Sequence, residues 1–294
     1  MTCPRAAIPD NLRTLPRMPS WVTSGRAEIP EDVAFLSGAA LAYLHLAVSG
    51  DDVPRALLRD RLTLRAAEAC VTRSGRPERA RELRDARHLL RPGDLPGPAG
   101  ESYLYWRRAV DRPVSVKALC RALPEIDAGK IGAWLDAGKA APVARAAKVL
   151  EIVLTDTPRA EVAALILAEA ALAQALGWDR LMPVLAPGLK RTDLRKRGAD
   201  LRLACHRAVS ASVPDAVRLA GDLARRAARL RAVVPKLRAK AAGAAVEMFL
   251  TRDAVAPSAL PLPDRAARRL CDRLVGLGVL RELTGRDTFR LYGV

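Results

Sequence analysis

The feature that most constrains the fold is a stretch in the middle of the chain that is apolar on nearly every side. Asp156, Thr157 and Pro158 give a helix N-cap followed by the proline that first helical positions favour. Ala, Leu and Ile then fill most positions up to Gly177, where the helix should end. Because a helix with so little polar surface must be covered on all sides, the sequence predicts a central, buried helix over 158–176.

The segments around this helix are also predicted to be helical. Only 4% of the residues are aromatic and Ala is abundant, a composition that favours helices over strands. Apolar residues recur at helical spacing between the prolines and glycines that mark helix ends. After an irregular, proline-rich arm over 1–30, we expect helices over 31–49, 54–73, 77–90, 101–111, 115–123, 125–139, 142–154, 199–212 and 214–234.

The C-terminal segment has a different order of elements. A helix over 237–250 precedes a short stretch punctuated by prolines, and a second helix follows from Asp264 to Leu277, where Gly278 ends it. The chain up to Tyr292 then reads as two short strands around a turn at 284–287. Helix, short helix, arginine-bearing helix and hairpin, in this order, predict a winged helix-turn-helix.

The predicted architecture is therefore all-α. We expect a multi-helical bundle with a C-terminal winged helix-turn-helix that carries a small β-hairpin. The predicted parts of the chain are the irregular arm over 1–30, a helical domain over 31–234 and the winged helix domain over 235–294.

The positive charge of the chain is concentrated in its last third. The formal net charge is +17, with 49 Lys and Arg against 32 Asp and Glu. Residues 190–294 hold 23 Lys and Arg against 10 Asp and Glu, whereas residues 1–189 hold 26 against 22. Such a surface attracts polyanions, so we expect double-stranded DNA as the partner of this segment. The alternative source of the charge is the codon usage of a GC-rich genome.

The candidate nucleic-acid-binding residues are arginines of the predicted recognition helix and hairpin. One side of the helix over 264–277 is apolar and the other is basic, and arginine binds both phosphates and guanine edges. We assign this role to Arg265, Arg268, Arg269 and Arg273 on the helix, and to Arg286 and Arg290 on the hairpin. Two alternatives stay open: the arginines are simply solvated, or the winged helix binds a protein.

A second group of arginines lies upstream. Arg218, Arg225 and Arg229 share one face of the predicted helix over 214–234, with Asp222 among them. This face either extends the basic surface or is neutralised by ion pairs within the helix.

No pattern of catalytic or metal-ligating residues is visible. The three histidines lack partners at metal-ligand spacing, and the five cysteines are scattered as in a reduced cytosolic protein. The Pro- and Gly-rich insert over 91–100 has Glu101 where a phosphate-binding loop has Lys, so we expect a turn between helices there. Glu169, on the central helix, is expected to be buried and paired with an arginine of a neighbouring helix. We predict no enzymatic activity, no metal and no cofactor.

The sequence also favours a cytoplasmic location. Residues 33–50 are uncharged, but the stretch falls short of the about 20 apolar residues that a membrane span needs, so a buried core helix is expected there. The first twenty residues hold several prolines and lack the apolar run of a signal peptide. We therefore expect no membrane contact.

Two resemblances add to this interpretation. The segment from Asp264 to Arg286 resembles the C-terminal winged helix of many Fic-type proteins, although the H-P-F-x-x-G-N-G-R motif of Fic chemistry does not occur in the chain. Stretches at 38–41, 91–100, 106–108, 235–240 and 289–293 are similar to an uncharacterised α-proteobacterial family, domain-of-unknown-function family 1403, which is often plasmid-borne. This resemblance implies a helical, cytosolic, bacterial protein and no particular activity.

The function that these observations favour is regulatory or architectural DNA binding through the basic C-terminal winged helix. The alternative is a protein-interaction module of a bacterial or plasmid-borne system, with another protein or a second copy of the chain as its partner.

Overall fold

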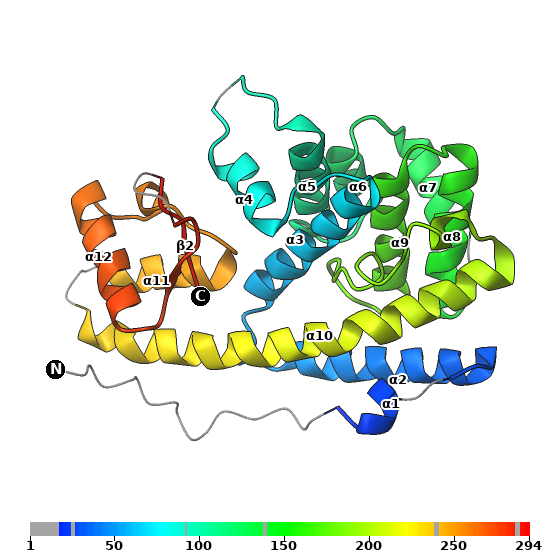
Figure 1. Ribbon diagram of the computed structural model, residues 1–294, viewed down its shortest axis with the longest axis horizontal. Coiled ribbons are helices and arrows are strands. Elements are labelled where there is room, and N and C mark those ends of the chain that lie inside the picture. The colour runs from blue at the N-terminus through cyan, green and yellow to red at the C-terminus, as the bar shows by residue number, and fades with distance from the viewer. Residues whose placement is uncertain (1–17, 25–26, 92, 138–139, 238–240, 286–288) are drawn as a thin grey trace. The chain divides into compact units, whose positions relative to one another are not determined.

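The computed structural model describes residues 18–24, 27–91, 93–137, 140–237, 241–285 and 289–294 (Figure 1). They belong to two compact units, a larger one of 18–44 and 62–216 and a smaller one of 45–61 and 217–294. Helices dominate both units, so the all-α class is confirmed for the described part of the chain.

The helices up to residue 233 are α1 (Ser20–Ser24), α2 (Pro30–Ser49), α3 (Arg55–Arg73), α4 (Ala80–His88), α5 (Gly97–Val110), α6 (Val116–Ala122), α7 (Ala128–Asp136), α8 (Pro142–Asp156), α9 (Glu161–Ala175), the 3-10 helix η1 (Asp193–Arg195) and α10 (Gly198–Val233).

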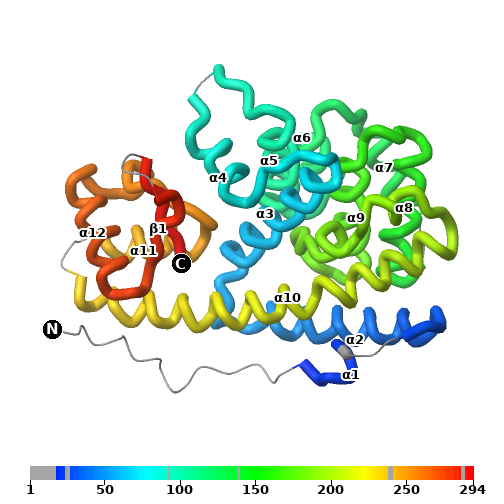
Figure 2. The backbone as a smooth tube through the Cα atoms, in the orientation of Figure 1, coloured from blue at the N-terminus to red at the C-terminus, as the bar shows by residue number. Residues whose placement is uncertain are grey.

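The core of the larger unit is α9, as the sequence predicts. Every residue from Ala163 to Ala173 is buried. Helix α8 packs along α9, and α5 and α7 also contact it (Figure 2). The helix begins at Glu161 rather than at residue 158, because α8 continues to Asp156 and a turn separates the two helices. Asp156 therefore does not cap α9; its carboxylate accepts a hydrogen bond from Trp134 Nε1 at 2.7 Å.

Pro214 does not separate two helices as the sequence predicts. The two helices expected over 199–212 and 214–234 are one helix, α10, with Pro214 inside it. A proline in a helix interior costs about 3 kcal/mol, and burial of Val209, Val213 and Ala216 around it offsets this cost. The insert over 91–100 is shorter than predicted, because α5 already begins at Gly97. The other expected helices are present with ends shifted by a few residues.

Helix α2 is only partly buried. Val33, Leu41 and Leu44 are buried, whereas Phe35 is 65% exposed and stacks on Trp21 of α1 with ring centroids 5.7 Å apart. By length and composition, α2 is the one helix of the described residues that is long and apolar enough to cross a membrane, with 39% of its most apolar stretch buried. The expected core helix is therefore covered on one side only.

The buried acid of α9 has a different partner from the one predicted. Glu169 is 1% exposed, but no arginine of the described residues pairs with it. Its Oε1 atom accepts hydrogen bonds from the backbone N–H groups of Leu185 at 2.7 Å and Ala186 at 3.0 Å. Burial raises the pKa of Glu169 to about 8, and the backbone donors only partly oppose this shift. The raised pKa favours the neutral form of the carboxyl group, and its two hydrogen bonds with backbone N–H groups fix the loop that follows α9.

The C-terminal part of the smaller unit combines helices with a small sheet. Its elements are the 3-10 helix η2 (Val234–Lys236), α11 (Ala242–Thr251), the 3-10 helix η3 (Pro257–Ala259), α12 (Asp264–Gly276) and the strands β1 (Arg281–Glu282) and β2 (Tyr292–Gly293). The strands pair antiparallel, Arg281 with Gly293 and Glu282 with Tyr292. Tyr292 also forms an antiparallel bridge with Val255. The expected hairpin strands are present, whereas residues 286–288 of its turn lie outside the described residues.

The protonated Glu169 predicts a pH-dependent stability. Folding raises the pKa of Glu169. The stabilisation that this group contributes to the folded state is therefore fully present below its ordinary pKa and is lost as the pH rises through about 8. Urea unfolding measures the free energy of unfolding. Between the ordinary pKa of Glu and about pH 8, this free energy should rise for a Glu169→Gln variant relative to the wild type, by up to about 1.4 kcal/mol per pH unit. The matched exposed variant Glu247→Gln should keep the wild-type profile. Parallel profiles for wild type and Glu169→Gln would contradict the protonated state.

Candidate nucleic-acid interface

Helix α12 carries the predicted recognition surface. Its buried side is formed by Ala267, Leu270, Cys271 and Leu274. The opposite side is exposed and holds all four predicted helix arginines, Arg265, Arg268, Arg269 and Arg273. Apolar residues at helical spacing anchor one side of the helix in the core, and the arginines are thereby directed to solvent.

These four arginines differ in their partners. Arg268 forms an i,i+4 ion pair with Asp264 at 2.8 Å, and Arg273 Nη2 donates a hydrogen bond to the carbonyl oxygen of Lys236 at 3.1 Å. Arg265 and Arg269 have neither a carboxylate nor a hydrogen-bond partner among the described residues. Within the described part of the chain, two of the four guanidinium groups can therefore bind an incoming anion without breaking an interaction.

The hairpin arginines are placed only in part. Arg290 is exposed and lies 3.9 Å from a carboxylate oxygen of Glu282. A hydrogen bond with Tyr292 and the charge of Glu282 raise the pKa of Arg290. Arg286 lies outside the described residues. The structure thus describes one of the two predicted hairpin arginines, and that one is ion-paired.

Phe289, at the same hairpin, was not singled out by the sequence. It is 70% exposed and has a φ of 58°, in the left-handed region that non-glycine residues rarely adopt. Such a conformation costs on the order of 1–2 kcal/mol, so the fold holds an apolar ring in solvent at a local energetic cost.

Further cations gather around the second half of α10. Burial lowers the pKa of Arg226, and the neighbouring charge of Arg281 on β1 lowers it further. Arg61 and Arg229 act in the same direction. Arg61, Arg226 and Arg281 lie in separate segments of the sequence, and only the fold brings their charges together. On the arginine-bearing face of α10, Arg225 forms an ion pair with Asp222. This part of the face is therefore neutralised, as one of the two predicted alternatives states.

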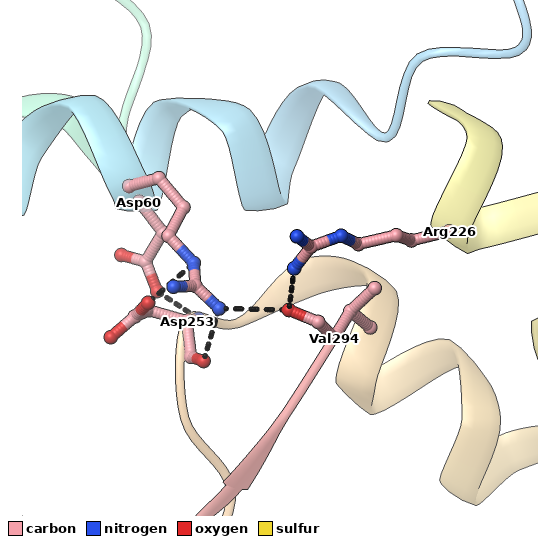
Figure 3. Close-up of polar contacts among 5 residues, drawn as sticks. Asp60, Arg226, Asp253 and Val294 are labelled. Atoms are coloured by element: carbon pink, nitrogen blue, oxygen red, sulfur yellow. Dashed lines mark hydrogen bonds and ion pairs between the residues drawn. The ribbon is translucent and has the colours of Figure 1, made fainter. Parts of the chain in front are cut away.

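A charged cluster anchors the segments that flank α12 (Figure 3). Arg61 of α3 forms an ion pair with Asp253 at 2.6 Å, and the Asp253 side chain is 1% exposed. The Asp60 carboxylate accepts a hydrogen bond from the backbone N–H of Asp253 at 2.7 Å. Arg61 Nη2 and Arg226 Nη1 donate to the backbone oxygen of Val294 at 3.2 and 3.3 Å. This cluster ties the stretch after α11 and the last strand to α3 and α10.

Gly293 fits the same cluster because it has no side chain. A Cβ atom at this position would lie 2.6 Å from the carbonyl oxygen of Asp253 and 2.9 Å from Leu283 Cδ1. Backbone atoms of two segments thus meet at Gly293, and any larger residue must push them apart.

The candidate metal-ligating side chains of the described part of the chain do not form a cluster. This part contains no group of three or more His, Cys, Asp or Glu side chains that could hold a metal ion. His206 Nδ1 lies 2.5 Å from Ser37 Oγ, but Ser37 is fully buried and also donates to the carbonyl oxygen of Ala34 at 2.9 Å. This pair joins α2 and α10.

Comparison with known proteins identifies a family. The family model DUF1403, described as a protein of unknown function, matches residues 6–294. No curated protein matches the chain.

Loss of Arg61 should destabilise the smaller unit. An Arg61→Met variant leaves Asp253 charged and buried without its counter-ion, which costs about 3 kcal/mol or more. Urea unfolding measures this loss. The control is Arg55→Ala on the same helix, which removes an exposed ion pair with Asp51 and should cost about 1 kcal/mol or less. Equal losses in the two variants would show that the buried pair has no special role.

A methyl group at position 293 should have an effect out of proportion to its size. Gly293→Ala forces contacts below 3.0 Å and should lower the free energy of unfolding by about 1–3 kcal/mol. Gly243→Ala, in α11 with nothing within 4 Å of the added Cβ, should instead raise it by about 0.5–1 kcal/mol. Thermal unfolding of the two variants tests this prediction. The prediction is wrong if the stabilities of both variants shift in the same direction.

Proposed function

We propose that this chain, which belongs to the DUF1403 family of proteins of unknown function, binds double-stranded DNA. The binding part would be a winged helix-turn-helix over residues 235–294. The role that this binding would serve is regulatory or architectural rather than catalytic.

The order of elements supports the winged helix. Helix α11, the bridge residue Val255, the turn η3, helix α12 and the strands β1 and β2 follow one another along the chain. Tyr292 of β2 pairs with Val255 on one side and with Glu282 of β1 on the other, so β2 lies in the middle of a minimal three-stranded arrangement. The departure from the pattern is the middle helix, which is reduced to the single turn η3.

The observation that carries the proposal is a pair of exposed arginines on α12 that have no partner among the described residues. Arg265 and Arg269 lie one helical turn apart, on the side opposite the buried stripe. A guanidinium group without a carboxylate partner can bind a phosphate or a guanine edge without first losing an ion pair. The exposed pair of Arg268 and Asp264 is worth about 1 kcal/mol or less, so Arg268 can exchange its partner for a phosphate.

The surrounding charges favour the approach of a polyanion. Arg252 and Arg281 are exposed and, like Arg265 and Arg269, have no ion-pair partner among the described residues. Their charges add to those of α12 in the region of the chain where positive residues outnumber acidic ones by more than two to one. Such a field speeds association and weakens steeply with salt.

The experiment is fluorescence anisotropy with a random DNA duplex and the full chain, titrated from low to moderate salt. The logarithm of the binding constant should fall linearly with the logarithm of the salt concentration. An Arg265→Ala/Arg269→Ala variant should bind at least tenfold more weakly, and its slope should be smaller by about 0.9 for each phosphate that the variant no longer binds.

The matched control is Arg112→Ala/Arg207→Ala, which removes two exposed arginines of the larger unit and the same net charge. It should bind DNA nearly as well as the wild type. Absence of DNA binding at low salt, or equal weakening in both double variants, would contradict the proposal and favour a protein as the partner of this segment.

A further inference from the structure

The larger unit contains a cavity of about 610 Å³ that the proposed DNA interface does not use. Its walls come from the end of α3, from α5, from the loop that follows α6 and from the first turn of α9. Ligand pockets for small organic molecules typically measure 300–1,000 Å³. The cavity is therefore large enough for such a molecule.

One wall of the cavity is cationic. Arg73, Arg159 and Arg191 line it from three separate segments, and no carboxylate among the described residues forms an ion pair with any of the three. Unpaired positive charges from distant parts of a sequence rarely meet without a reason, because their mutual repulsion costs free energy. An anion in the cavity would remove this cost.

Arg73 is held in a fixed position toward this wall. Its Nη1 atom donates to the carbonyl oxygens of Ala186 at 2.7 Å and Leu189 at 3.0 Å, and its Nη2 atom donates to Cys70 Sγ at 3.2 Å. The Nε atom is buried and has no hydrogen-bond partner. Among the described residues, only neutral groups form hydrogen bonds with this guanidinium group.

The start of α9 adds donors to the same wall. Glu161, Val162 and Ala163 form the first turn of the helix and line the cavity. No side chain of the described residues caps this end of the helix, so the backbone N–H groups of its first turn carry the partial positive charge of the helix dipole, beside the carboxylate of Glu161 in the same turn.

The rest of the cavity lining is partly acidic and partly apolar. The Tyr105 hydroxyl lies between the carboxylates of Glu125 at 2.8 Å and Glu101 at 3.1 Å, so the two acidic groups share this hydroxyl as a hydrogen-bond donor. Leu123, Ile126 and Leu165 supply the apolar surface. A ligand that fits both sides has one anionic end and an apolar body.

We propose that this cavity binds a small organic anion, with its charged group at Arg73, Arg159, Arg191 and the start of α9 and its apolar part against Leu123, Ile126 and Leu165. The site is independent of the proposed DNA interface, so either can fail without the other. A protein with both sites would carry an effector site in one unit and a nucleic-acid interface in the other.

The test uses 8-anilinonaphthalene-1-sulfonate, an apolar ring system with one anionic group, as the probe and the full chain as the protein. Fluorescence titration at constant ionic strength should give one saturable site on the wild type. Arg159→Ala/Arg191→Ala should weaken binding at least tenfold, whereas Arg112→Ala/Arg207→Ala should leave it unchanged.

A second pair of variants separates charge from shape. Val162→Glu places a negative charge at the cavity wall in the first turn of α9, where an acidic residue suits the helix dipole, and it should abolish binding. Val162→Gln has nearly the same size and should retain it. Equal binding by the two Val162 variants, unchanged binding in Arg159→Ala/Arg191→Ala, or no saturable binding to the wild type would each overturn the proposal.

Discussion

The ion pair between Arg61 and Asp253 places a buried charge at the point where several segments of the smaller unit meet. A charge removed from water is tolerated only when its partners are fixed, and here the Asp60 carboxylate and the backbone of Val294 complete the arrangement. The stretch that leads into α12 and the strand that closes the hairpin are therefore held at their ends. The buried apolar side of α12 then directs the basic side of this helix to solvent.

Local patterns predict the helices of this protein because each depends on neighbours in sequence. The apolar run of α9 and the stripe of α12 are visible as periodicities, and both helices are found near their expected positions. The fate of Pro214 could not be predicted, because it depends on side chains that bury the flanking turns. The partner of Glu169 could not be predicted either, since backbone N–H groups of a loop leave no signal in residue types.

The sequence predicts which arginines form the candidate interface. It does not predict which of them form ion pairs. Spacing along α12 separates the exposed side from the buried one, whereas ion pairing distinguishes Arg265 and Arg269 from Arg268 only in three dimensions. The cavity arginines illustrate the same limit more strongly. Arg73, Arg159 and Arg191 are far apart in the sequence, and no motif links them.

The buried carboxyl group of α9 makes folding a proton-transfer event as well as a packing event. Folding raises the pKa of Glu169 above its ordinary value. Folding is therefore coupled to the uptake of protons from the buffer at this site. The heat of folding measured by calorimetry includes the ionisation enthalpy of whichever buffer supplies these protons.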